Sequence, residues 1–165
     1  MKLLHALYGT RPHTAGPALR AALALVLLPH GCQLLFGWFG GFGFAGSMHY
    51  FTQVEGLPWL VGFGVIFLQF FGALLLLAGV LGRLLALCYI ALFAGMIVTS
   101  HWEHGFFMNW MGTQKGEGFE YHLLAIGISL ALLLSGSGRW SADALWTRRR
   151  SGAGPGALSP GGARI

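Results

Sequence analysis

The sequence has very few charged residues. Of its 165 residues only 9% are charged, whereas 55% are hydrophobic and the mean hydropathy is +0.66. An ordinary soluble domain carries about 25% charged residues, so ten basic and five acidic side chains cannot solvate the surface of a soluble domain of this length. The same hydrophobicity excludes a disordered chain, and two cysteines exclude a scaffold held by disulfides. The composition leaves a small integral membrane protein.

Long stretches without any charge locate the membrane-spanning segments. They cover residues 21–54, 56–82, 84–102 and 121–138. A helix needs about 17–25 apolar residues to cross the hydrocarbon core, and helices satisfy their own backbone hydrogen bonds there. We predict spanning helices at about 18–36, 58–81, 84–101 and 120–137. The first stretch exceeds one span, and its Gly- and Phe-rich part, residues 37–47, is predicted to form a re-entrant or interfacial loop.

The basic residues indicate the orientation. Four spans place both termini on one side of the membrane, and that side then holds every Lys and Arg except Lys115. The excess of cations predicts that both termini are cytoplasmic. We therefore predict an all-α four-transmembrane-helix bundle over 18–145, after a cytoplasmic segment 1–17. Residues 146–165 are predicted to be a basic and then Gly/Pro-rich disordered tail that meets anionic lipid and no nucleic acid.

Two weaker patterns concern the packing of the helices. Arg20 and Arg83 each open a predicted outward-going helix that ends in an aromatic, Gly-containing loop, which suggests two pseudo-repeated helical hairpins. Ala91, Gly95 and Thr99 form a face of small residues on the third helix, and such faces let helices approach closely in lipid. The sequence leaves open whether this face serves a contact within the chain or a homo-oligomer.

Polar side chains within the predicted spans are few. Such groups are costly in lipid and are candidates for function by default. His30 and Gln33 share one face of the first helix, Gln69 lies near the middle of the second, His101 ends the third and Glu120 begins the fourth. Except for Gln69, all lie in the outer half by depth. We predict that the five residues form a polar pocket that binds a cofactor or another small molecule.

Three interpretations of these polar residues compete. The first is a structural network that fixes helix register, and the second is a small-molecule pocket in which Glu120 and His30 exchange protons or bind a headgroup. The third is a metal or haem site. His101 and His104 are spaced like metal ligands, but this spacing alone is a weak signal and HExxH is absent. His30 is the haem-ligand candidate. No arrangement of a nucleophile and a base identifies catalytic residues.

Several segments of the chain resemble the DoxX family of small membrane proteins. The opening helix and loop, the second helix, the last outer loop and the closing segment each contribute a motif. These are Leu19-Arg20 with His30-Gly31-Cys32-Gln33-Leu34 and Phe39-Gly40-Gly41; Gly72-Ala73-Leu74-Leu75 with Gly79 and Arg83; Gly105-Phe106-Phe107-Met108-Asn109 with Gly116-Glu117-Gly118-Phe119-Glu120; and Gly136-Ser137-Gly138-Arg139 with Asp143.

The resemblance implies a four-helix protein of the bacterial inner membrane. Relatives include the small DoxD subunit of thiosulfate–quinone oxidoreductase, so it implies an oxidoreductase subunit with protein partners in a membrane redox complex and a quinone as the ligand. It adds Arg20, Arg83, Asn109 and Glu117 as family-motif positions. This chain has Leu34 where the family often carries Lys, which argues against an anionic, thiosulfate-like substrate. The alternatives are a non-enzymatic membrane scaffold or small-solute carrier, and a haem- or metal-binding membrane protein.

Overall fold

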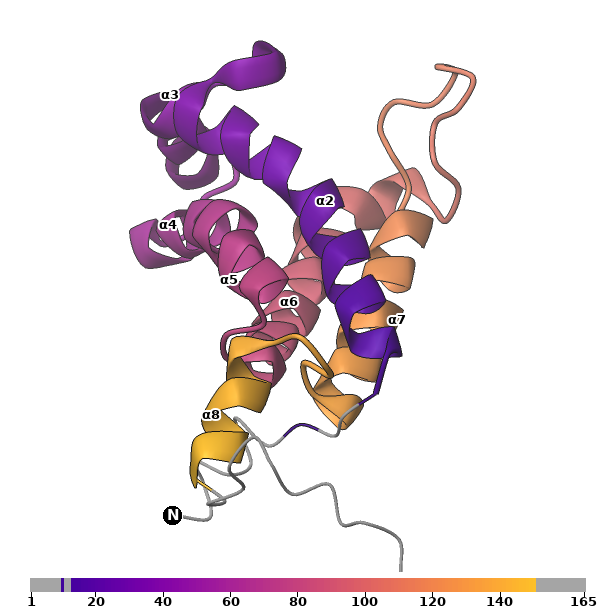
Figure 1. Ribbon diagram of the computed structural model, residues 1–165. Coiled ribbons are helices and arrows are strands. Elements are labelled where there is room, and N and C mark those ends of the chain that lie inside the picture. Colours follow the sequence, from indigo (N-terminus) through magenta and orange to yellow (C-terminus); the bar gives the residue numbers. More distant parts are fainter. Residues whose placement is uncertain (1–9, 11–12, 151–165) are drawn as a thin grey trace, which may run out of the picture.

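The computed structural model describes Thr10 and residues 13–150, with the side chains of Arg149 and Arg150 left out (Figure 1). Over this part of the chain the fold is all-helical. Short 3-10 turns (η1, η5) and π-helical turns (η2, η3, η4) interrupt or extend the α-helices. The elements in order are α2 (Ala15–Phe36), η1 (Trp38–Gly40), α3 (Gly43–His49), η2 (Tyr50–Val54), α4 (Trp59–Phe67), η3 (Leu68–Gly72), α5 (Ala73–Ala78), α6 (Gly82–Met96), η4 (Ile97–His101), η5 (Trp102–His104), α7 (Glu120–Ser135) and α8 (Ala142–Arg150).

Three continuous helical segments are long and apolar enough to cross a membrane. They are Ala15–Phe36, Trp59–Ala78 and Gly82–His104, and they lie where the charge-free stretches predict the first three spans. The fourth apolar helix, α7, has 16 residues. At 1.5 Å per residue it extends about 24 Å, which is less than the roughly 30 Å of a hydrocarbon core. Three of the predicted helices are therefore confirmed as long and apolar enough to cross a membrane, whereas the predicted count of four spans stays a prediction.

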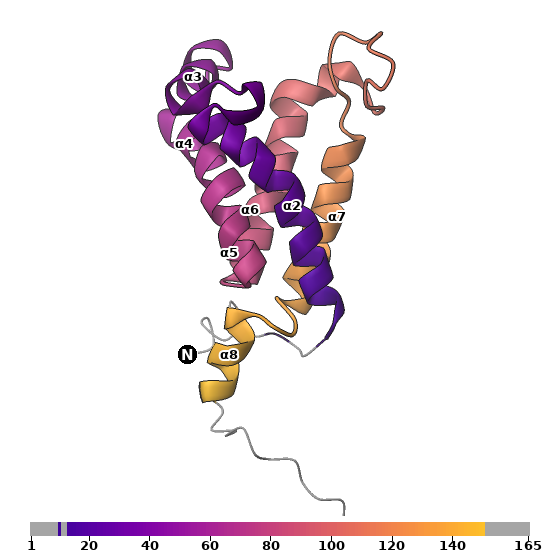
Figure 2. The same cartoon turned by 45° about the horizontal axis from the view of Figure 1, so that its top comes forward.

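The four long helical segments run side by side, with the loops at one end and α8 at the other (Figures 1 and 2). We call these the loop end and the α8 end. The first loop (37–58), predicted to be re-entrant or interfacial, folds into η1, α3 and η2, and α3 packs on α2 and α4. The second loop (105–119) joins η5 to α7. At the α8 end the predicted tail begins as helix, because α8 continues to Arg150. Residues 151–165, and 1–12 apart from Thr10, lie outside the described residues.

The core of the bundle lies between α2, α5, α6 and α7. Its fully buried side chains include Leu27, Leu76, Tyr89, Phe93 and Leu132. Large apolar side chains also cover the outside of the bundle, where Leu25, Leu60, Leu124 and Leu134 are exposed. Helices that face lipid need an apolar outer surface as well as an apolar core.

Arg20 joins the ends of two helices at the α8 end. Its side chain is 2% exposed. One guanidinium nitrogen donates to the carbonyls of Leu76 (3.4 Å) and Leu77 (2.7 Å) in the last turn of α5. The other donates to the carbonyls of Arg139 (3.3 Å) and Trp140 (3.0 Å) after α7. A planar guanidinium suits this fork of acceptors, and its charge neutralises the negative end of α5.

Asp143 performs the complementary task at the start of α6. Its carboxylate is 3% exposed and accepts hydrogen bonds from the backbone N–H groups of Leu81 (2.9 Å) and Gly82 (3.0 Å) and from the Ser137 hydroxyl (2.6 Å). A carboxylate at a helix N-terminus satisfies free N–H groups and the helix dipole. Gly79 makes this turn possible, because it has φ +71° and a side chain there would collide with Arg20. We call this arrangement the Arg20–Asp143 junction.

Gly31 allows α2 to approach η3 closely. A Cβ at Gly31 would lie 2.7 Å from the Cα of Phe70, so backbone would have to move. A Cβ at Gly95 would meet no atom within 4 Å. We expect Gly31→Val to lower the free energy of unfolding by about 1–3 kcal/mol, as overpacking does, and Gly95→Val to cost clearly less. Thermal unfolding of both variants in one detergent measures the difference, and equal losses would contradict the close approach.

Candidate functional site

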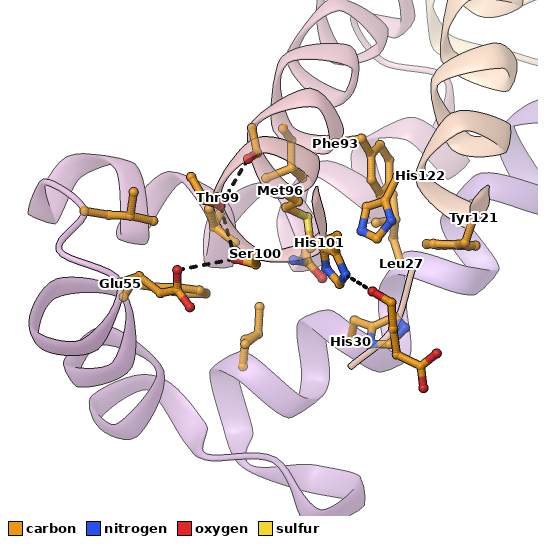
Figure 3. A pocket seen from close by; sticks show the side chains of 18 of the residues that line it. Leu27, His30, Glu55, Phe93, Met96, Thr99, Ser100, His101, Tyr121 and His122 are labelled. Atoms are coloured by element: carbon orange, nitrogen blue, oxygen red, sulfur yellow. Dashed lines mark hydrogen bonds between the residues drawn. The ribbon is translucent and has the colours of Figure 1, made fainter. Parts of the chain in front are cut away.

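A cavity of about 760 Å³ lies at the loop end of the bundle, between α2, α4 and α6 (Figure 3). Its walls are mainly apolar, and the two loops contribute residues at the loop end. The apolar wall includes Leu27 and Leu34 of α2, Val61 and Val65 of α4, and Phe93 and Met96 of α6. A cavity of this size with few polar groups is typical of a small-molecule site.

All three π-helical turns of the described chain contribute to this cavity. Tyr50 comes from η2, Gln69 from η3, and Ser100 and His101 from η4. A π turn inserts a residue into an α-helix and so changes which side chains face inward, and such turns are frequent at functional sites. Gln69, which is only 5% exposed, thereby joins the wall from the middle of the second segment.

Four of the five residues predicted to form the pocket line this single cavity. They are His30, Gln33, Gln69 and His101. Glu120 is not among the lining residues. Its carboxylate accepts a hydrogen bond from the backbone N–H of Met108 (2.9 Å) and so fastens the second loop to the start of α7.

His30 and Gln33 form a defined pair on α2. The Gln33 amide nitrogen donates to the carbonyl of Phe39 (3.3 Å), and the Nδ1 of His30 lies 3.1 Å from the Gln33 Oε1. Since Oε1 can only accept, His30 Nδ1 carries the proton and donates. In the neutral ring Nε2 is then an acceptor, so a ligand with a hydroxyl or N–H group can bind there.

His101 and His122 form a second pair at the far wall. His101 Nδ1 donates to the backbone carbonyl of Glu117 (2.9 Å) and is held by the second loop. The ring centroids of His101 and His122 are 4.1 Å apart, and Figure 3 shows His122 beside Phe93. His122 is not among the five residues predicted to form the pocket, but it is 4% exposed and lines the cavity.

The lining residues include two carboxylates and no Lys or Arg. Glu55 accepts hydrogen bonds from the hydroxyls of Tyr50 and Ser100 (3.3 Å to Ser100), and so connects the first loop to η4. The hydrogen bond to Glu55, together with burial, raises the pKa of Tyr50, which keeps its proton at neutral pH. Glu117 is the other carboxylate. Leu34 lines the wall where the family motif often has Lys. These charges favour an uncharged ligand over an anion.

The family-motif residues of the second loop have structural contacts. The Glu117 carboxylate accepts from the backbone N–H of Asn109 (2.7 Å). The Asn109 side chain bonds both the carbonyl (3.1 Å) and the N–H (3.0 Å) of Gln114. The remaining two motif residues lie at the α8 end: Arg20 belongs to the Arg20–Asp143 junction, and Arg83 of α6 donates to the carbonyl of Leu134 (3.3 Å). Asn109 and Glu117 therefore shape the loop that closes the cavity.

The structure places no third ligand beside the candidate metal ligands His101 and His104 among the described residues. Within residues 13–150, no group of three or more His, Cys, Asp or Glu side chains is arranged to hold a metal ion. His101 and His104 both line the cavity, but His101 Nδ1 is bonded to a carbonyl and His104 packs against Gly116, where a side chain would collide with its ring.

Three apolar segments of spanning length, with apolar side chains turned outward, define a helical multi-pass membrane protein whose surface contacts lipid. The chain belongs to the DoxX family: the DoxX model matches residues 17–102, just over half of its length. No curated protein and no solved structure matches it. The match runs from the first turn of α2 to the first residue of η5, a range that holds most of the residues of the cavity wall, and it ends before the second loop and α7.

Proposed function

We propose that the protein is a four-span subunit of a redox complex in the bacterial inner membrane, and that its cavity binds the ring of a quinone. The observation that carries the proposal is the composition of the cavity wall. Apolar side chains form most of the wall surface and surround polar groups that include four side chains of α2, η4 and α7, namely His30, Gln33, His101 and His122. The charged lining residues are the carboxylates Glu55 and Glu117, and Lys and Arg are absent. A quinone and its reduced quinol suit such a site, because the quinone oxygens accept hydrogen bonds and the quinol hydroxyls can donate to Nε2 of His30 and His101, while the rest of the molecule is apolar.

The distribution of charge supports an orientation with both termini in the cytoplasm. The α8 end carries Arg20, Arg83, Arg139 and Arg148, whereas Lys115 is the cation of the two loops. The loop end also holds four of the five acids. If cations mark the cytoplasmic side, the cavity lies in the outer half of the bilayer. In this arrangement α7 is the fourth span, and its short length is met by local thinning of the bilayer.

Quinone binding can be tested with the purified protein in lipid nanodiscs. We expect a benzoquinone with a decyl tail to quench tryptophan fluorescence saturably, beyond the quenching by a membrane-spanning control protein in equal nanodiscs. We also expect quinone in an organic extract of the purified protein. Absence of both, together with normal respiratory electron transfer in a deletion strain, would overturn the proposal and favour a scaffold or small-solute carrier.

A cation introduced at Leu34 is expected to weaken quinone binding. Leu34→Lys places a charge in the apolar wall, where it must remain solvated and so takes up part of the cavity. We expect the dissociation constant of the decyl benzoquinone to rise about tenfold, which corresponds to roughly 1.4 kcal/mol. Leu34→Met, which preserves volume and polarity, is the matched control. Equal affinity of both variants would contradict a ligand at this wall.

A further inference from the structure

Two buried polar atoms in the cavity wall have no hydrogen-bond partner among the described residues. They are Nδ1 of His122 and the hydroxyl of Tyr121, neighbours in the first turn of α7. Both residues belong to the cavity lining, and His122 is 4% exposed. Buried polar groups in native proteins are nearly always hydrogen-bonded, because an unpaired one loses its hydration without compensation. Unpaired atoms also occur away from the cavity, at His13 and Ser47, but these two belong to residues that line it. A ligand that displaces the atoms now covering them can therefore supply the missing partners.

The surroundings of His122 fix its ring in place. Its centroid lies 4.1 Å from that of His101, 5.5 Å from Tyr121 and 5.9 Å from Phe93. These contacts hold the imidazole by packing while Nδ1 stays unpaired. A ring held in this way can bind a ligand oxygen without losing rotamer freedom, which favours affinity.

The other end of the cavity opens between α4 and α6. These helices make at most marginal contact with each other, since α4 packs on α2 and α3 and α6 packs on α7. Val61 of α4 is 47% exposed although it lines the cavity. The small residues Ala91 and Gly95 of α6 and Thr99 of η4 are exposed and also line it. The small-residue face, which the sequence assigned to helix packing, borders this opening, and no helix of the described chain covers it.

We propose that Tyr121 and His122 hold the polar ring of an uncharged, membrane-dissolved quinone, whose apolar tail leaves the cavity between α4 and α6 past Gly95. The inference rests on the proposed function and adds where each half of the ligand lies. The tyrosine hydroxyl donates to one ring oxygen, and His122 carries its proton on Nδ1 and donates to another oxygen of the ring. Small side chains on α6 leave room for a flexible chain that continues into lipid.

Variants of α7 test the position of the ring. We expect His122→Phe, which preserves ring packing but removes both nitrogens, to raise the dissociation constant of the decyl benzoquinone at least tenfold, and Tyr121→Phe to raise it severalfold. His122→Asn, whose amide lies near the position of Nδ1, should retain more affinity than His122→Phe. Tyr89→Phe is the control, because that hydroxyl donates to the carbonyl of Leu68 (2.9 Å) in the core. It should leave the dissociation constant unchanged.

The opening between α4 and α6 is tested by substitutions at two glycines that both have free space for a side chain. A Cβ meets no atom within 4 Å at Gly95 of α6 or at Gly127 of α7, but Gly95 alone lines the cavity. We expect Gly95→Leu to weaken binding of the decyl benzoquinone about tenfold and to leave binding of the same ring without a tail unchanged. Gly127→Leu should change neither. A thermal unfolding curve for each variant verifies that it is folded.

The outcomes separate this inference from the proposed function. If the wild-type protein binds neither the decyl benzoquinone nor the same ring without a tail, the proposed function is wrong. If the wild-type protein binds both compounds, but His122→Phe and Tyr121→Phe bind the decyl benzoquinone as tightly as the wild type does, the ring lies elsewhere and the inference is wrong. If Gly95→Leu changes the oligomeric state and not the affinity, the face of α6 contacts a second copy of the chain and the assigned path of the tail is wrong.

Discussion

Replacement of Arg20 by methionine is expected to lower the free energy of unfolding by about 3–5 kcal/mol, the cost of removing one partner from a buried charged network. Methionine fills much of the same volume, so the loss arises from the hydrogen bonds. Four backbone carbonyls, at Leu76, Leu77, Arg139 and Trp140, would lose the guanidinium as donor, although that of Leu76 also accepts from the N–H of Gly79 (2.9 Å). The melting temperature in a mild detergent should fall by roughly 10 °C, and circular dichroism or a thiol-reactive dye can follow it.

Two further variants make this result specific. Arg20→Lys keeps the charge but cannot reproduce the fork of a guanidinium, so its loss should lie between those of wild type and Arg20→Met. Arg139→Met is the matched control, because the Arg139 side chain is exposed and lies 5.8 Å from the ring of Trp140. A loss as large for Arg139→Met as for Arg20→Met would show that general charge, and not the buried fork, stabilises the α8 end.

Replacement of Asp143 by alanine is the second large effect that we expect, with a loss of about 3 kcal/mol. The N-terminus of α6 would lose both acceptors for the N–H groups of Leu81 and Gly82, and the buried Ser137 hydroxyl would lose its partner. The variant should unfold at lower temperature in detergent, and proteolysis should cleave it first near residues 79–82, where the chain turns between α5 and α6.

Variants with graded expected losses test whether the Asp143 carboxylate stabilises the start of α6. Ser137→Ala removes one of its three donors and should cost about 1 kcal/mol. Glu103→Ala removes an exposed carboxylate of the loop end and should change stability little. Because Arg20 and Asp143 belong to one junction, the double variant Arg20→Met/Asp143→Ala should lose less stability than the two single losses combined. Full additivity would argue that the two side chains act independently.

The sequence predicted the helical segments well, because charge is excluded from the interior of a membrane. Arg83 and Glu55 end charge-free stretches, and the helices Trp59–Ala78 and Gly82–His104 lie close to the spans predicted from them. The start of the fourth helix at Glu120 agrees with the predicted start. Helix α8 was not predicted, and its last residues fall where the sequence predicted the start of a disordered tail, since a short polar helix leaves no hydrophobic pattern. Ser141, whose hydroxyl accepts from the N–H of Ala144 (3.1 Å), is the local cap that could have indicated it.

The candidate site was predicted in part, because depth along a helix can be counted from the sequence whereas direction around it is less certain. Depth brought His30, Gln33 and His101 to the same level, and they line one cavity. The π-helical turn η4 shifts the face on which His101 lies, which a regular period of 3.6 residues cannot reveal. For the same reason the roles at the start of α7 differ from expectation: Glu120 binds the second loop, whereas His122, two residues later, lines the cavity.

The Arg20–Asp143 junction also has a consequence for biosynthesis. Arg20 enters the membrane near the beginning of translation, whereas its acceptors at Arg139 and Trp140 and the carboxylate of Asp143 are made more than a hundred residues later. Until then the guanidinium must keep its hydration at the interface, and the start of α6 has no carboxylate cap. A nascent chain that stops before residue 137 can therefore insert its first three segments but cannot fasten them. Completion of the bundle depends on residues 139–143, which leave the ribosome late, so an incomplete chain remains recognisable to proteases by its unfastened α8 end.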